Sequence, residues 1–461
     1  MGVKKFFNLN LHGSEGGSVG HETMECDLLV IGSGMAGLSA AGWAAERGAR
    51  VVVVEKASTR GGSAVLSGGV LWTATSASKM SMYGCGDPRL GDVVLDTYPR
   101  ALSWMRSRGI QVSPAMSVLH GRGYAIDLIH HLDDCIQMVE KGGGYVVYET
   151  TTETLLKDDA GKVIGARTVC ADGVVDVISE NTILATGGYQ GSAELRAQNI
   201  HENARNLLLR SNQVSRGDGI RLGTGAGGVF DKNNKGFYGH LVTKSPNWGE
   251  ERYYTGLSQY HSDHSLLFNE QGFRYCDETE GDHTNTYRTV FESNARAILL
   301  WDKRIQETYA TAHVVLSAPP LDKYKVAIEN GGEGVHTTDI AELARFATAH
   351  GFDGAQLVKS LAEYQEGSIN DWENLNPPRR ESAIPLDGEY YALIVYPAIT
   401  FTFGGLMIDS DARVLKEDGA VLPGLLAAGS DAGGAYGIGY AGGLALAITF
   451  GITAAQTAGW K

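Results

Sequence analysis

The sequence has few cysteines, and their spacing excludes both a disulfide framework and a zinc site. The five are odd in number, widely separated and without a C-x-x-C pair: Cys26, Cys85, Cys135, Cys170 and Cys276. Disulfide scaffolds and zinc ribbons need closely spaced, even sets. We therefore predict a reducing environment and a cytoplasmic location.

The chain also lacks an excess of positive charge and a long apolar run. Its net charge of −14 excludes the basic patch that nucleic acid or an anionic membrane surface would need. The longest apolar stretch, residues 444–455, falls short of the ~18 residues of a membrane span and is interrupted by Gly451. Residues 1–24 lack the apolar core of a secretory signal and are expected to form a flexible tail. Neither nucleic acid nor a membrane span is expected.

Metal ligands are not grouped in the sequence. The pair His130-His131 would point about 100° apart on a helix, so the two rings could not chelate one ion from the same face. We predict no metal site.

Glycine, in contrast, is abundant. The 61 glycines among 461 residues exceed the ~7% average, and they gather where apolar runs end instead of repeating with a period. Such clusters bring backbone close to other groups. A chain of this length exceeds the roughly 250–300 residues of a single core, so two domains are expected.

One glycine cluster lies between two predicted elements of a dinucleotide site. Residues 28–31 read as a buried parallel strand and residues 35–47 as a helix packed on a sheet. The first glycine of a G-x-G-x-x-G turn allows a tight bend, the second admits a pyrophosphate, and the third lets helix and strand pack closely. The turn consists of Gly32, Ser33, Gly34, Met35, Ala36 and Gly37.

A carboxylate follows at the spacing that this site requires. The second predicted strand, residues 50–54, ends in Glu55 and Lys56, and Glu55 lies 18 residues after Gly37. It is placed to accept hydrogen bonds from a ribose diol and to repel a 2′-phosphate. A second formal match, residues 223–228, follows a helix-like segment instead of a strand and is not expected to bind a nucleotide.

Beyond Lys56 the chain departs from an NAD-binding pattern and carries further small-residue turns. The sequence from Cys26 onward resembles the flavoprotein family that contains the fumarate reductase and succinate dehydrogenase flavoprotein subunits and the 3-ketosteroid dehydrogenases. The resemblance implies FAD and an α/β fold: a Rossmann-like FAD-binding domain with an inserted α+β capping domain. It also implies that residues 121–123 begin a helix. The further positions that it assigns to FAD are Gly61, Gly62, Ser63, Ser67, Gly68, Gly69, Thr152, Ala185, Thr186, Gly187, Gly188, Asp218, Gly404, Gly429, Ser430, Asp431, Leu444 and Ala445.

The same resemblance implies a division of the chain. The FAD-binding domain is expected over residues 25–230 and 388–461, and the capping or substrate domain over residues 231–387. Residues 377–380, Pro-Pro-Arg-Arg, are expected to act as a hinge. Ligand is expected where the domains meet.

Several positions at which this chain departs from the family pattern bear on which substrate it can bind. Dicarboxylate-reducing members carry a histidine and two arginines at places where this chain has Thr400, the Gly281-Asp282 neighbourhood and Tyr440. Without those cations a dicarboxylate could not be clamped in the same way. No histidine stands near Leu66 to tether the flavin, so FAD is expected to be bound non-covalently.

The 3-ketosteroid dehydrogenases fit better at one place. Residues 390–392, Tyr-Tyr-Ala, resemble the F-Y-A segment of that family, and Tyr391 stands 13 residues before Gly404. The resemblance implies that Tyr391 holds the ketone oxygen of the substrate; the alternative is that it packs in a strand. Tyr254 and His240 are candidates for substrate contact or base chemistry, and Tyr440 for a pocket wall.

These observations predict an FAD-dependent dehydrogenase or ene-reductase. It would move a hydride between flavin N5 and the carbon β to a ketone of a bulky apolar, 3-ketosteroid-like substrate, with an external electron acceptor or donor. One alternative is a dicarboxylate or tricarboxylate (fumarate-type) oxidoreductase that draws its cations from Arg252, Arg274 or Arg288. The other is a flavin electron carrier.

Overall fold

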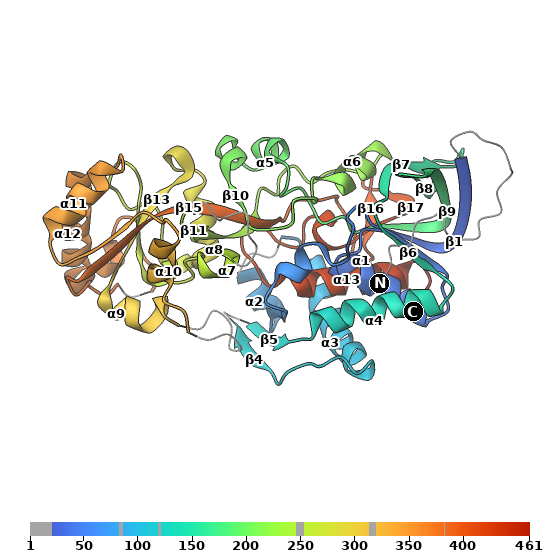
Figure 1. Ribbon diagram of the computed structural model, residues 1–461, viewed down its shortest axis with the longest axis horizontal. Helices are drawn as coiled ribbons and strands as arrows, with labels where there is room; N and C mark the ends of the chain where they lie inside the picture. The colour runs from blue at the N-terminus through green and yellow to red at the C-terminus, as the bar shows by residue number, and fades with distance from the viewer. Residues whose placement is uncertain (1–20, 83–85, 119–120, 246–252, 313–319, 382) are drawn as a thin grey trace. The chain divides into compact units, whose positions relative to one another are not determined.

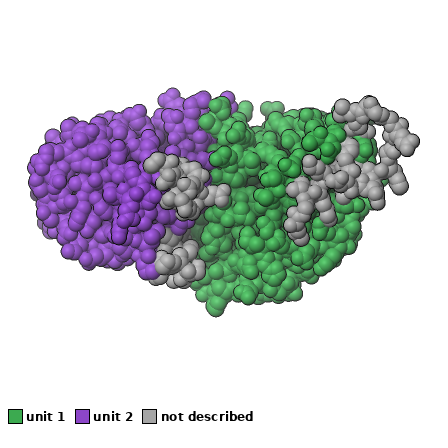
Figure 2. All heavy atoms as spheres, in the orientation of Figure 1, with its two compact units in different colours: residues 1–195, 211–237, 401–461 green, residues 196–210, 238–400 purple. Residues whose placement is uncertain are grey.

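The computed structural model describes residues 21–82, 86–118, 121–245, 253–312, 320–381 and 383–461 (Figure 1). The chain divides into two compact units, coloured separately in Figure 2. Unit 1 comprises residues 1–195, 211–237 and 401–461, and unit 2 comprises residues 196–210 and 238–400.

Unit 1 is built on a sheet whose centre is parallel. Strand β1 (His21–Ile31) pairs in parallel with β2 (Val51–Val54) and with β9 (Gly173–Leu184). The four valines of β2 are all buried, as expected of a strand covered on both faces. The other strands of this sheet are β6 (Tyr145–Val147), β7 (Thr151–Lys157), β8 (Val163–Cys170), β16 (Arg413–Leu415) and β17 (Val421–Ala427).

Small residues let the helices of unit 1 pack closely. Helix α1 (Met35–Glu46) packs against α4 (Leu128–Lys141) and α13 (Gly443–Thr457). A Cβ at Gly451 would stand 2.4 Å from the Ala36 carbonyl oxygen, so α1 and α13 can approach this closely only because that residue is glycine. The remaining helices of unit 1 are α2 (Ala77–Met82), α3 (Pro88–Ser107) and α6 (Asp218–Gly225).

A three-stranded sheet in unit 1 corrects one sequence prediction. Strands β3 (Val70–Ala74), β4 (Met116–Val118) and β5 (Gly121–Ala125) pair in the order β3-β5-β4. The prediction that residues 121–123 begin a helix is therefore wrong. A Cβ at Gly121 would lie 2.1 Å from the Thr73 carbonyl oxygen, which shows that the glycine serves close strand pairing, and the helix begins at Leu128.

Unit 2 is organised around one long strand. Strand β15 (Tyr390–Thr402) pairs with β10 (Leu208–Leu209), β11 (Phe237–Val242), β13 (Ala297–Asp302) and β14 (Gly334–Thr337), and β13 pairs with β12 (Leu266–Phe268). The buried side chains of β13 and β15 form a core with those of two helices, α11 (Ile340–Ala349) and α12 (Gly354–Asn370). The remaining helices are α5 (Ala193–Asn199), which begins in unit 1, and α7 (Tyr253–Gly256), α8 (Asp282–Thr289), α9 (Lys303–Ile305) and α10 (Lys323–Glu329).

Unit 2 differs from the capping domain expected over residues 231–387. It also contains residues 196–210 and 388–400, because β10 pairs with β15, whereas residues 231–237 belong to unit 1. The expected hinge lies inside unit 2, where Arg379 donates to Glu278 at 3.1 Å and the Pro377 carbonyl accepts from Arg274 at 3.1 Å. Among the described helices, none is both long and apolar enough to span a bilayer.

Candidate active site and cofactor cradle

The turn between β1 and α1 has three glycines with different surroundings. A Cβ at Gly32, whose φ is +109°, would stand 2.2 Å from the Ala185 carbonyl oxygen, and one at Gly37 would stand 2.0 Å from the Gly32 carbonyl oxygen. At Gly34 the nearest heavy atom would be 3.9 Å away. Gly34 is also the N-cap of α1 and gives no side-chain hydrogen bond to the helix. Two glycines are required by packing, and the third leaves open space beside uncapped N–H groups.

Glu55 lies beside this turn and is largely buried. One carboxylate oxygen accepts from the backbone N and the Oγ of Ser33, each at 2.8 Å, and the other accepts from the Ala57 N at 2.8 Å. A carboxylate can accept about four hydrogen bonds, so capacity remains for a ribose hydroxyl. The turn between β1 and α1 therefore orients the carboxylate of Glu55, the acid that the sequence predicts for a dinucleotide site.

Asp431 fastens the C-terminal segment of unit 1 to the end of β9. Its carboxylate accepts from the backbone N and, at 3.0 Å, the Oγ1 of Thr186, and from the Gly188 N at 3.3 Å. Burial raises the pKa of this carboxyl. These bonds bring residues 186–188 together with the short helix η9 (Gly429–Asp431), which holds three of the predicted FAD positions. The Asp431 carboxylate thus positions the turn by bonding to protein groups.

Other predicted FAD positions also lie in unit 1. Lys56 forms an ion pair with Asp218, and Ser67 Oγ donates to the Ala64 carbonyl at 2.6 Å. Leu444 and Ala445 occupy the first turn of α13, and Gly404 leaves room for the Asn234 carbonyl oxygen, which would stand 2.7 Å from a Cβ there.

Two buried polar atoms of unit 1 show that the cradle fits a polar ligand. Thr152 Oγ1 and Gln190 Oε1 are buried and have no hydrogen-bond partner. Unpartnered buried polar atoms are rare and costly in folded proteins. Thr152 is the residue whose backbone is predicted to meet adenine, and its carbonyl oxygen accepts from Arg221 at 2.9 Å. With the open space at Gly34 and the remaining capacity of Glu55, these residues fit FAD.

Tyr440 is the centre of an aromatic cluster in unit 1. Its ring centroid lies 5.2 Å from that of Trp72, 5.9 Å from Phe401, 6.1 Å from Tyr436 and 6.5 Å from Phe403, whose ring is parallel to it. Its hydroxyl accepts from the Gly443 N at 3.0 Å, at the start of α13. We call these five residues the Tyr440 cluster. It places rings where the dicarboxylate-reducing pattern has an arginine.

His240 is the centre of a polar group in unit 2. Its Nδ1 is 2.7 Å from Asp282 Oδ2, its Nε2 is 2.8 Å from the Tyr238 hydroxyl, and its ring centroid is 4.5 Å from that of Tyr260. Burial lowers the pKa of His240, although the Asp282 carboxylate acts in the opposite direction. Burial also disfavours charge on Asp282, but His240 and His283 hold the pKa of this carboxyl well below its usual range. The group pairs a buried carboxylate with a neutral imidazole.

Arg210 adds a cation that the sequence did not single out. Its guanidinium donates to the Tyr260 hydroxyl at 2.8 Å, to Ser258 Oγ at 3.1 Å, to Thr400 Oγ1 at 3.2 Å and to the Tyr254 carbonyl at 3.2 Å. All four acceptors are neutral. Among the described residues, no carboxylate forms an ion pair with Arg210. Its only sequence signal is a basic residue at the end of the apolar run 207–209, which no motif marks.

The structure brings Tyr254 close to this group, but not Tyr391. Tyr254 is buried, and its carbonyl accepts from Arg210. Tyr391 lies between two parallel rings, with its ring centroid 4.0 Å from that of His336 and 5.9 Å from that of Trp301. It stands nine residues before Thr400 in β15, about 30 Å along an extended strand. These ring contacts agree with the packing alternative, and a role of Tyr391 toward a ketone stays a prediction.

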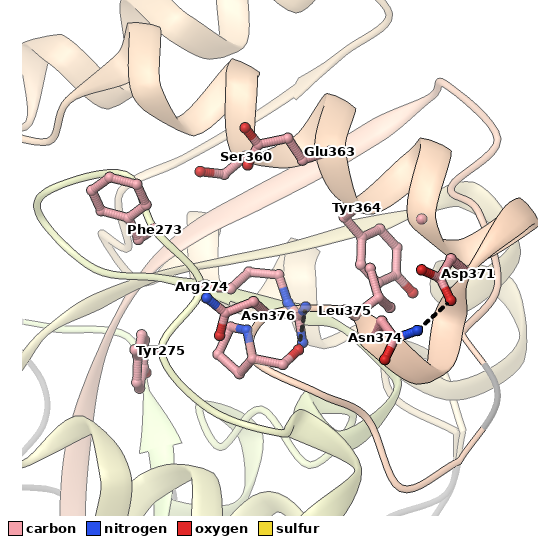
Figure 3. A pocket seen from close by; sticks show the side chains of 12 residues that line it. Phe273, Arg274, Tyr275, Ser360, Glu363, Tyr364, Asp371, Asn374, Leu375 and Asn376 are labelled. Atoms are coloured by element: carbon pink, nitrogen blue, oxygen red, sulfur yellow. Dashed lines mark hydrogen bonds between the residues drawn. The ribbon is translucent and has the colours of Figure 1, made fainter.

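Two of the three arginines named as alternative cations form ion pairs with carboxylates. Arg252 lies outside the described residues. Arg274 pairs with the buried Glu278 at 2.6 Å, and Arg288 pairs with Glu280 at 3.2 Å. Arg274 also lines a cavity of about 610 Å³ inside unit 2, between the loop at Phe273 and the C-terminal part of α12 (Figure 3). Arg274 is the one residue of this cavity named from the sequence as a candidate cation, and the residues predicted for FAD or catalysis lie elsewhere in the described chain.

The parallel sheet, the glycine turn and the oriented acid define an FAD-binding α/β protein. A family model described as FAD binding domain matches residues 27–141 and 130–445. Because these ranges cover most of the chain, the protein belongs to this family, and FAD is its cofactor.

Individual relatives indicate the class of reaction more closely than the family model does. Fumarate reductase (cytochrome) of Shewanella frigidimarina is 28% identical, over 96% of this chain and 78% of the relative. Urocanate reductase of Eggerthella lenta is 26% identical, over 89% of this chain and 70% of the relative. The structure of 3-ketosteroid delta1-dehydrogenase from Sterolibacterium denitrificans, in complex with 1,4-androstadiene-3,17-dione, has a TM-score of 0.72 at 18% identity and covers 95% of this chain and 100% of that one, which shows a shared fold. The protein is thus an FAD-dependent oxidoreductase that acts on CH–CH groups.

Proposed function

We propose that the protein exchanges a hydride between FAD and the carbon β to a carbonyl group of a bulky, largely apolar substrate. FAD supplies the two-electron hydride chemistry. The chain would hold FAD non-covalently through unit 1, while the residues around His240 in unit 2 would act on the carbonyl side of the substrate. An external donor or acceptor would complete the electron balance.

The observation that carries this proposal is the Tyr440 cluster. In dicarboxylate-reducing members the resemblance assigns an arginine to the place of Tyr440, and a guanidinium there would bind carboxylate bidentately. Here the Tyr440 ring lies among four other aromatic rings, and its hydroxyl is committed to the Gly443 N. Aromatic rings favour apolar and ring-containing ligands. A ketone of the 3-ketosteroid type suits such an aromatic environment better than fumarate does.

Arg210 supports a second candidate, a substrate with one carboxylate. A partly buried guanidinium that bonds only to neutral groups is favourably compensated by a ligand anion. The acceptable substrate would then be an α,β-unsaturated acid with an apolar body. The urocanate and fumarate reductases are named for unsaturated acids. For a ketone, Arg210 would instead stabilise the negative charge that develops on the carbonyl oxygen.

One experiment separates these substrates. The FAD-loaded enzyme is photoreduced without oxygen and mixed with 4-androstene-3,17-dione, cinnamate or fumarate, and flavin reoxidation is followed. We expect reoxidation by the enone. Reoxidation by cinnamate alone would select the second candidate, and reoxidation by fumarate alone would overturn both.

Variants of Arg210 sharpen the result. With the enone, Arg210→Met is expected to lower the reoxidation rate about 10²-fold, because a charged donor to the developing oxyanion is lost. With cinnamate, Arg210→Met is expected mainly to raise the cinnamate concentration that gives the half-maximal reoxidation rate. Arg288→Met removes a half-exposed arginine of the same unit and should leave both unchanged.

A further inference from the structure

We propose that Tyr238 exchanges the proton at the carbon α to the substrate carbonyl, and that His240 and Asp282 relay this proton. The inference deepens the proposed function and rests on it. Hydride transfer at the β carbon requires a proton to be added or removed at the α carbon, and the sequence offered only Tyr254 and His240 as candidates for base chemistry, without a partner for either.

The local structure explains why these three side chains meet. Tyr238 and His240 are two residues apart in β11, so their side chains project from the same face of the strand. Asp282 is the first residue of α8, and Gly281 before it has a φ of +105° that turns the chain into the helix. The result is a continuous hydrogen-bonded chain, with 2.7 Å from Asp282 to His240 and 2.8 Å from His240 to Tyr238.

The exposure of the three side chains indicates which end of this hydrogen-bonded series a substrate could reach. The side chain of His240 is 4% exposed and that of Asp282 is 14% exposed. Tyr238 is only half-buried. Of the three residues, Tyr238 is therefore the most open to a small molecule, and the imidazole of His240 lies behind it.

The protonation states follow from the surroundings. Asp282 and His283 approach His240 from α8, and Arg210 approaches it from the segment after β10. Tyr260 contributes a ring contact, Tyr238 comes from the same strand, and Asp263 acts on Asp282 in turn. With Asp282 ionised and His240 neutral, the tautomer assigned from these partners has Nδ1–H donating to Asp282 and Nε2 accepting from the Tyr238 hydroxyl. This is the arrangement by which a carboxylate orients an imidazole base.

The step balances in both directions. In dehydrogenation the α C–H bond breaks, its proton goes to the Tyr238 oxygen, and the Tyr238 proton moves to His240 Nε2. The electron pair of that bond forms the C=C double bond as the β hydrogen leaves with its pair to FAD. In reduction each transfer is reversed, and imidazolium at His240 re-protonates Tyr238 as Tyr238 protonates the α carbon.

Dehydrogenation and reduction should therefore depend on pH with opposite signs. Dehydrogenation needs neutral His240, so its rate should rise with pH through the pKa of His240. Reduction needs the imidazolium, so the rate of flavin reoxidation should fall as pH rises through the same pKa. Because burial lowers this pKa, both changes should occur below the ordinary range of histidine.

The test uses single-turnover reoxidation of the photoreduced holoenzyme by 4-androstene-3,17-dione or cinnamate across pH. Tyr238→Phe should slow reoxidation by about 10²-fold or more and remove its pH dependence. Tyr275→Phe, which also deletes a buried hydroxyl in unit 2, should leave both unchanged. A slower Tyr238→Phe enzyme with the wild-type pH profile would show a structural role and overturn the relay.

A second readout does not depend on turnover. The titration of His240 is followed by NMR in the oxidised holoenzyme, and Asp282→Asn should lower the pKa of His240, because the carboxylate raises it. An unchanged titration would also overturn the relay. Failure of the wild-type enzyme to reoxidise with either probe would overturn the proposed function itself, and the relay with it.

Discussion

The two units of the chain reach their functional groups in opposite ways. In unit 1, the nucleotide turn and its acid follow one another along a short stretch: a turn of six residues and an acid after the end of the next strand. In unit 2, Arg210, His240 and Asp282 come from three separate segments and meet only in the folded sheet and its loops. The nucleotide turn is encoded locally, whereas the groups that we propose for substrate chemistry come together only through tertiary structure.

The two units should also differ in the substitutions that they tolerate. The nucleotide turn of unit 1 depends on missing side chains, because a Cβ at Gly32 or Gly37 would overlap backbone atoms. Unit 2 depends on charges that are buried and paired, above all Glu278 with Arg274 and Arg379. Substitutions should therefore damage the two units by different routes.

The largest effect is expected at Gly37. Gly37→Val would drive a side chain into the Gly32 carbonyl oxygen, 2.0 Å from the new Cβ, so we expect no soluble holoenzyme. Gly34→Ala meets no atom closer than 3.9 Å and should fold, but its methyl group occupies the open space assigned to pyrophosphate. Its FAD affinity should fall about 10- to 100-fold, or roughly 1.4–2.7 kcal/mol. Soluble yield, circular dichroism and flavin titration measure the two outcomes, and wild-type affinity in Gly34→Ala would contradict the cradle.

A smaller effect is expected in unit 2 from Glu278→Gln. Glu278 is fully buried and pairs with Arg274 at 2.6 Å and Arg379 at 3.1 Å, so its removal leaves two buried guanidinium groups uncompensated. We expect a loss of about 3–5 kcal/mol in the free energy of unfolding. Thermal unfolding of the holoenzyme would measure this loss. The exposed pair Lys359–Glu363 is the control, since Lys359→Ala should cost at most about 0.5 kcal/mol. Equal effects of the two variants would remove the contrast between the units.

The smallest effect is expected at Gly225, the middle glycine of the second G-x-G-x-x-G match. It lies in α6, and a Cβ there would meet nothing within 4 Å. Gly225→Ala should raise stability by about 0.5–1 kcal/mol through helix propensity and leave FAD affinity unchanged. Flavin titration of Gly225→Ala and of Gly34→Ala shows which of the two G-x-G-x-x-G turns binds the nucleotide. A weaker flavin complex in Gly225→Ala would contradict our assignment.

The sequence sufficed for the FAD-binding fold because its signals are local. Strand, glycine turn, helix and acid lie within residues 28–55, and each has a steric reason that can be read without tertiary contacts. His240 was singled out, but its partner Asp282 is 42 residues away and was seen only as part of a departure from the arginine pattern. No local rule joins the two.

Tyr391 and Arg210 show why the rest could not be predicted. The 13-residue spacing from Tyr391 to Gly404 was taken as a motif, but nine of those steps run along the extended strand β15 and separate the tyrosine from Thr400 by about 30 Å. Arg210 precedes Ser211, where unit 1 resumes, and enters unit 2 only because β10 pairs with β15. Such strand pairing depends on distant residues, so the candidate cations chosen from the sequence, Arg252, Arg274 and Arg288, did not include Arg210.

The four chain crossings between the units, at residues 195–196, 210–211, 237–238 and 400–401, have a consequence for recombination. A gene fragment encoding residues 238–400 alone would carry His240 and Asp282 to a new host, but the host would still supply its own counterpart of Arg210. Grafting the substrate chemistry onto another flavoprotein therefore requires two cassettes, and a chimera made with one would combine the proton relay of one parent with the anion preference of the other.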